Sequence, residues 1–109
     1  MKFLEFYQEE PGGTFTHDGI DYWLNPLFKF TANTPVQEIN IDELSWVVTD
    51  PEEESSYADI NTPVLVTHWQ DKLVVIDGYH RLLKSMKLGK KTIPAKIISD
   101  RLLSYFEKR

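Results

Sequence analysis

The second half of the chain has the most regular pattern of apolar and polar positions. Residues 64–69 and 72–76 are two apolar runs rich in β-branched residues, separated by two polar residues. They predict two strands joined by a tight turn, and the unbroken run 72–76 is typical of a strand covered on both faces. Over residues 79–88 the apolar period becomes that of a helix with one buried face, and Gly89 is suited to end it. The apolar positions of this helix are Tyr79, Leu82, Leu83 and Met86.

The first third of the chain predicts a hairpin. Residues 14–17 and 20–24 flank Asp18-Gly19, the commonest short hairpin signal. Residues 3–7 form another apolar run, which fits a strand. The dipeptide Asn25-Pro26 can begin a short helical turn with proline at its first position. The side chains expected to face the core after it are Leu27, Phe28 and Phe30.

Shorter elements complete the pattern. Residues 36–41 predict a strand, and a one-turn helix follows it. Residues 49–59 are polar and acidic, which indicates a surface loop. Residues 92–98 predict a strand, and residues 100–108 predict an amphipathic helix. The inner face of that last helix would consist of Leu102, Leu103 and Phe106.

The size of the chain fits one domain, which we place over residues 1–109. At 109 residues it is long enough to bury a modest core. We predict an α+β fold in which helices pack on a small mixed β-sheet, with an N-terminal β-hairpin extension. The extension covers residues 1–34, the core covers residues 35–99, and a C-terminal helix covers residues 100–109.

Composition narrows the cellular setting. No stretch approaches the ~18 consecutive apolar residues of a membrane span, and Glu5 comes too early for the apolar core of a signal peptide. Because the chain has no cysteine, disulfides, thiolate nucleophiles and cysteine metal sites are excluded. We expect a cytoplasmic protein with no membrane partner, from a bacterium or from a phage or plasmid that a bacterium hosts.

Charge is distributed unevenly along the chain. The net charge is −5, yet residues 1–60 hold two basic and thirteen acidic residues, whereas residues 61–109 hold ten basic and four acidic residues. Such a split predicts a basic surface on an acidic body. Two interpretations stay open: the two halves neutralise each other by packing together, or the basic face binds a nucleotide or a nucleic acid.

The turn from the strand 72–76 into the helix 79–88 is the strongest candidate for chemistry. The first N–H groups of a helix have no internal partners, and the helix dipole adds partial positive charge there, so such a turn binds phosphate. Gly78 allows a tight turn and the close approach of a ligand. His80 and Arg81 add donors, and an arginine can bind two phosphate oxygens at once.

The residues of this turn also permit a structural interpretation. His80 and Arg81 would then brace the turn, paired with Asp77 or with an acid from the loop 50–59. Asp77 itself is either the N-cap of the helix or a base or magnesium-binding carboxylate beside a phosphate. On the same helix face, further basic residues form either a strip that leads an anion away from the turn or an ordinary solvated face. This set consists of His80, Lys84, Lys87 and Lys91.

The second half of the chain resembles the core of the ParB/sulfiredoxin superfamily. The likeness lies in Val64-Leu65-Val66, in the run from Val75 through Gly78, His80 and Arg81 to Lys84, and in Ile93-Pro94-Ala95. Residues 36–44 are similar to the entry strand and short helix of ParB N-terminal domains, so the resemblance covers residues 35–99. It implies a nucleotide-phosphate site that takes ATP or CTP. The site residues that it implies are Gly78, His80 and Arg81, with Asp77 at the edge.

Three departures from the family pattern limit what is carried over. Tyr79 stands where sulfiredoxins have their catalytic cysteine, which excludes reduction of a sulfinic acid. ParB proteins continue into a helix-turn-helix domain, whereas this sequence ends at Arg109, so we do not expect sequence-specific binding to a partition site. The segment 50–59 is acidic where ParB proteins carry arginine, which argues against a switch driven by CTP.

Three functions therefore compete. The first is binding of a nucleotide or phosphate group at Asp77–Arg81, extended to nucleotide hydrolysis or phosphotransfer, with magnesium as a possible cofactor. Its ligand-binding candidates are Gly78, His80, Arg81 and Lys84, and its catalytic candidates are Asp77, His80 and Asp59. The second is a non-catalytic protein-interaction module, such as a phage- or plasmid-encoded inhibitor, which the acidic first half supports.

The third is a ParB-like nuclease or DNA-binding protein. Its support is the basic strip, through contacts with nucleic-acid phosphates, and the overall negative charge argues against it. We expect no metal site built from histidine, because His17, His68 and His80 lie far apart and show no ligand spacing.

Overall fold

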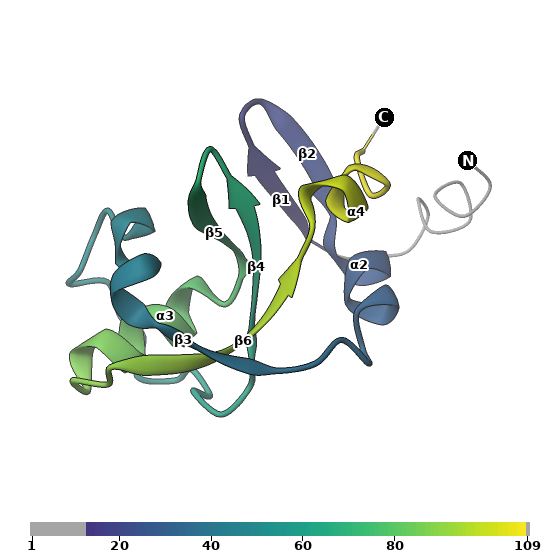
Figure 1. The fold of residues 1–109 in the computed structure, drawn as a ribbon. Helices are drawn as coiled ribbons and strands as arrows, with labels where there is room; N and C mark the ends of the chain where they lie inside the picture. Colours follow the sequence, from purple (N-terminus) through teal and green to yellow (C-terminus); the bar gives the residue numbers. More distant parts are fainter. Residues whose placement is uncertain (1–12, 109) are drawn as a thin grey trace. The chain divides into compact units, whose positions relative to one another are not determined.

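The chain forms two units in the computed structural model, which describes residues 13–108 (Figure 1). Within the described residues, one unit combines residues 13–34 with residues 99–108, and the other consists of residues 35–98. The strand predicted at residues 3–7 lies outside the described residues. Within residues 13–108, no helix has the length and apolar character needed to cross a membrane.

The hairpin of the first unit is confirmed. Its strands are β1 (Thr14–His17) and β2 (Ile20–Trp23), which pair antiparallel. The turn residues Asp18 and Gly19 both have positive φ angles, 52° and 77°, as a two-residue hairpin turn requires. Helix α2 (Leu24–Phe30) follows directly, so it begins two residues before the predicted first helical position, Pro26.

Helix α2 buries only some of the side chains predicted to face the core. Leu27 is fully buried, but Phe28 and Phe30 are exposed, so the prediction for these two phenylalanines is wrong. Phe28 directly follows the buried Leu27, and consecutive helix residues point about 100° apart, so the Phe28 side chain turns away from the buried face. Phe30 packs edge-on against Phe106, with the ring centroids 5.7 Å apart.

The C-terminal helix α4 (Asp100–Ser104) is shorter than predicted. Ser99 caps it, since its Oγ accepts the Leu102 N–H at 3.0 Å. The chain then leaves the helix and joins the hairpin: the Trp23 N–H donates to the Phe106 carbonyl oxygen, and the Lys108 N–H donates to the Asp21 carbonyl oxygen, each at 2.7 Å. Strand pairing thus satisfies backbone groups that a longer helix would have used.

A four-stranded sheet organises the second unit. Its strand order is β3-β6-β4-β5, with β6 parallel to β4 and the other neighbours antiparallel. The sheet is therefore mixed, as predicted. Its strands are β3 (Gln37–Asn40), β4 (Val64–Trp69), β5 (Lys72–Asp77) and β6 (Thr92–Ile98). Two short 3₁₀ turns, η1 (Ile41–Glu43) and η2 (Ser45–Val47), replace the predicted one-turn helix.

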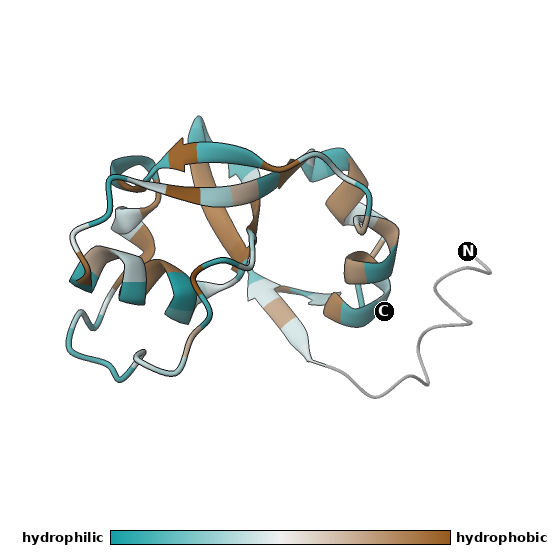
Figure 2. Ribbon diagram, turned by 90° about the horizontal axis from the view of Figure 1, so that it is seen from below, coloured by the Kyte–Doolittle hydropathy of each residue, from teal (hydrophilic) through white to brown (hydrophobic). Residues whose placement is uncertain are grey.

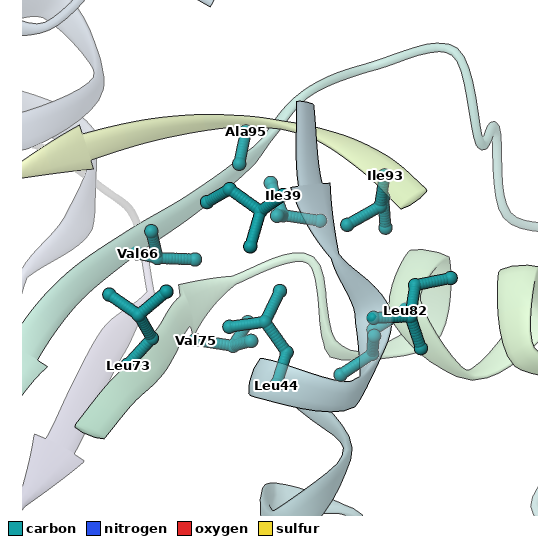
Figure 3. Packing of buried hydrophobic residues seen from close by; sticks show 10 residues of the cluster. Ile39, Leu44, Val66, Leu73, Val75, Leu82, Ile93 and Ala95 are labelled. Carbon is teal, nitrogen blue, oxygen red and sulfur yellow. The ribbon is translucent and has the colours of Figure 1, made fainter. Parts of the chain in front are cut away.

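Helix α3 (Tyr79–Lys87) closes the core of this unit. The side chain of Leu82 lies among apolar side chains of the sheet (Figure 3). Leu44, which lies between η1 and η2, belongs to the same cluster. Leu82 and Leu83 are buried, whereas Tyr79 and Met86 at the ends of the predicted apolar stripe are half-buried. Gly89 follows the helix with φ 73°, the left-handed conformation expected of a helix stop. These elements confirm a small α+β fold.

Candidate functional site: the turn between β5 and α3

Gly78 forms the N-cap of α3 in a conformation that only glycine adopts with ease. Its φ is 107°, and a Cβ atom built on it would lie 2.6 Å from Val64 Cγ1 and 3.2 Å from Arg81 Cζ. Strand β4 therefore begins in direct contact with the backbone of the turn. Both the backbone angle and the packing require glycine here.

Asp77 does not cap the helix. Among the described residues no side chain bonds to the N-terminal N–H groups of α3, so the N-cap interpretation of Asp77 is wrong. Its carboxylate Oδ2 instead accepts a hydrogen bond from Arg81 Nη2 at 2.5 Å. The reason is geometric: with Gly78 as the N-cap, Asp77 still belongs to β5, and its side chain meets the residue one helical turn further on.

Arg81 braces the turn against the start of β4. Its Nη1 donates to the carbonyl oxygens of Thr62 at 3.2 Å and Pro63 at 2.5 Å. With the bond to Asp77, three of the five guanidinium N–H groups have acceptors in this unit. The side chain is 17% exposed. Arg81 is thus a structural brace that also lines the pocket described below.

The acidic loop between η2 and β4 lies along the basic face of α3. His80 Nε2 donates to Glu53 Oε2, Lys87 Nζ donates to the Glu53 carbonyl oxygen at 2.5 Å, and Lys84 Nζ donates to the Ala58 carbonyl oxygen at 2.7 Å. Figure 2 shows mainly hydrophilic colour along this loop. The predicted pairing of His80 with a loop acid is confirmed, and His80, Lys84 and Lys87 of the predicted basic strip are bonded to the loop.

Carboxylates of the loop also stabilise the loop itself. Asp59 Oδ1 accepts the Asn61 N–H at 3.0 Å, and its Oδ2 accepts the Thr62 hydroxyl at 3.1 Å. Glu54 Oε1 accepts the Ser56 N–H at 2.6 Å, and hydrogen bonds from Ser56 lower the pKa of Glu54 below its usual value. Such side-chain bonds to nearby backbone are typical of turns. The loop therefore holds a defined shape beside α3.

A pocket of about 540 Å³ lies over the turn. This volume is within the range of small-molecule sites. Its lining brings together five of the six residues proposed as ligand-binding or catalytic; Lys84 is not part of the lining and is bound to the loop. The lining residues are Tyr57, Ala58, Asp59, Thr62, Ile76, Asp77, Gly78, Tyr79, His80 and Arg81.

Tyr57 is a pocket residue that the sequence pattern does not single out. It is 69% exposed, and its ring centroid lies 5.5 Å from that of His80. The ring of Tyr79 also meets the His80 ring, edge-on, with the two ring centroids 5.4 Å apart. A tyrosine in an acidic loop has no periodic signal; the one available hint is that Tyr57 is the aromatic residue of segment 49–59.

Comparison with protein-family models gives no match to this chain, and comparison with curated proteins gives none. Within residues 13–108, no three histidine, aspartate or glutamate side chains gather as ligands for a metal ion. The functional argument therefore depends on the chemistry of the pocket.

Proposed function

We propose that residues 35–98 form a ParB/sulfiredoxin-like domain that binds the phosphate of a nucleotide over the turn Asp77–Arg81. The observation that carries the proposal is the uncapped N-terminus of α3, which opens into a pocket of about 540 Å³ at Gly78. The first N–H groups of a helix attract anions when no side chain occupies them.

The order of elements supports the family proposal. A strand and 3₁₀ turn lead to the β4–β5 hairpin, and β5 passes through Gly78 into α3 before β6 returns parallel to β4. His80 and Arg81 occupy the first turn of that helix. This is the arrangement on which the resemblance in sequence depends.

Charge in the pocket favours a ligand that is accompanied by magnesium. Its lining contains two carboxylates, Asp59 and Asp77, of which Asp77 is paired with Arg81. Glu53 adds a third negative charge beside His80. A bare triphosphate meets repulsion from Asp59 and Glu53, and a bound divalent cation reduces this repulsion. ATP or CTP with magnesium is the ligand that we propose.

Calorimetric titration with ATP and with CTP, each with and without magnesium, tests the proposal. We expect saturable binding that magnesium strengthens, and weaker binding by His80→Ala. The matched control is His68→Ala, because His68 is exposed on β4 and is not among the lining residues. Absence of binding at millimolar ligand, by protein shown to be folded by circular dichroism, would reject the proposal.

Catalysis is a separate part of the proposal. Asp77 is held by Arg81 and His80 by Glu53, whereas Asp59 is exposed and bonds to its own loop. Asp59 is therefore the exposed carboxylate of the pocket lining that no described basic side chain holds, and we propose that it meets magnesium or an attacking water. Phosphate release from ATP or CTP, compared between the wild type and Asp59→Asn, tests this step. Release that Asp59→Asn leaves unchanged would remove Asp59 from the catalytic candidates.

A further inference from the structure

Tyr57 occupies an anchored position at the pocket. Single exposed aromatic side chains are common on protein surfaces, so exposure alone indicates nothing. Here, however, both flanks are fixed: Ser55 and Ala58 are buried, and the Ala58 N–H donates to the Ser55 carbonyl oxygen at 3.0 Å. Lys84 holds the Ala58 carbonyl oxygen from α3. The loop thus presents an exposed ring from a fixed backbone.

The ring also belongs to a contiguous aromatic group. Tyr57, His80 and Tyr79 follow one another at centroid distances of 5.5 and 5.4 Å, and all three line the same pocket. Ala58 and Ile76 add apolar surface to the lining. The pocket therefore combines a phosphate-attracting part at Gly78 with an aromatic part, and an inorganic phosphate would fill only a small share of its volume.

We propose that Tyr57 determines ligand specificity by stacking on a planar ring, so that the pocket selects phosphate esters of aromatic nucleosides over phosphate groups alone. This inference rests on the proposed phosphate site and adds what distinguishes one phosphate ligand from another. Stacking tolerates different bases, since each has an aromatic face. Tyr57 accordingly distinguishes ligands that carry an aromatic base from ligands that carry none, and it distinguishes adenine from cytosine less strongly.

The experiment compares ATP with inorganic triphosphate, both with magnesium, by calorimetry. We expect wild-type protein to bind ATP about tenfold more tightly than triphosphate, the size of effect typical of one aromatic–base stack. Tyr57→Ala should remove this preference by weakening ATP binding and leaving triphosphate binding unchanged. Tyr57→Phe should retain it, because the ring remains.

The control is Tyr105→Ala, because Tyr105 is an exposed tyrosine of the other unit. Equal affinity of wild-type protein for ATP and triphosphate would overturn the role of Tyr57 and leave the phosphate site standing. The role of Tyr57 would also be overturned if Tyr57→Ala weakened the binding of ATP and of triphosphate equally, since that result indicates a structural role. Binding of neither ligand would reject the phosphate site and this inference together.

Discussion

Arg81 and Asp77 form an ion pair across the start of α3, with Arg81 Nη2 2.5 Å from Asp77 Oδ2. The same guanidinium binds the carbonyl oxygens that precede β4. One side chain therefore joins the end of β5, the first turn of α3 and the entry to β4. The pocket over Gly78 exists in this form because these three segments are held together.

Replacing Arg81 by alanine should lower the free energy of unfolding of the unit formed by residues 35–98. The change leaves Asp77 and the carbonyl groups of Thr62 and Pro63 without their partner, which typically costs about 2 kcal/mol. Urea unfolding measures the loss. Arg101→Ala is the control, because Arg101 is exposed on α4 and should change stability by no more than ~0.5 kcal/mol. Equal effects of the two variants would contradict the bracing role.

Gly78→Ala should destabilise the protein more than Gly89→Ala does. Both glycines have a positive φ, but a Cβ at Gly78 meets Val64 at 2.6 Å, whereas a Cβ at Gly89 has no atom within 4 Å. Gly89→Ala therefore has only the backbone strain, about 1 kcal/mol, and Gly78→Ala adds a steric clash of roughly 1–3 kcal/mol. The difference in thermal unfolding between the variants isolates the clash. A smaller loss for Gly78→Ala would show that the turn moves away from β4 without cost.

Glu53→Gln should strengthen nucleotide binding. The carboxylate of Glu53 holds His80 at the edge of the pocket, and its negative charge opposes an anionic ligand. Removing one charge near a protein surface changes binding by ~1 kcal/mol, which corresponds to about fivefold in affinity. Glu52→Gln is the matched control, since it removes the same charge from the exposed neighbouring residue. If both variants bind alike, the pairing of Glu53 with His80 has no part in ligand binding.

The first unit should lose stability at high pH through Tyr22. Burial raises the pKa of Tyr22 above its ordinary value of 10.0, and the charges of Glu107 and Asp18 raise it further. A group with a raised pKa binds its proton more tightly in the folded state, so its contribution is complete below pH 10 and is lost as the pH rises through the folded value. Urea unfolding at pH 9 and pH 11 should show a smaller loss for Tyr22→Phe than for the wild type. An identical loss in both proteins would exclude Tyr22 as a cause.

Local signals predicted most of the elements. The Asp18-Gly19 hairpin, the strands at 64–69 and 92–98 and the helix that begins at Tyr79 agree with the structure, because turn chemistry and apolar period act between near neighbours. Two predictions in the first unit failed for the same reason: the burial of Phe30 and the length of the C-terminal helix. Phe30 and the residues after Ser104 are governed by partners distant in sequence, Phe106 and the strand β2.

The sequence by itself determined the strand-to-helix turn and its residue types, since glycine, histidine and arginine follow the strand within a few positions. Only the tertiary structure decided which of these groups face a ligand. His80 meets Glu53 across 27 residues, and Arg81 meets Thr62 across 19. Such pairings depend on the path of the loop over α3. A local pattern of apolar and polar positions does not predict that path. Loop closure brings together residues from two segments, and the periodicity of each segment says nothing about its contacts with the other.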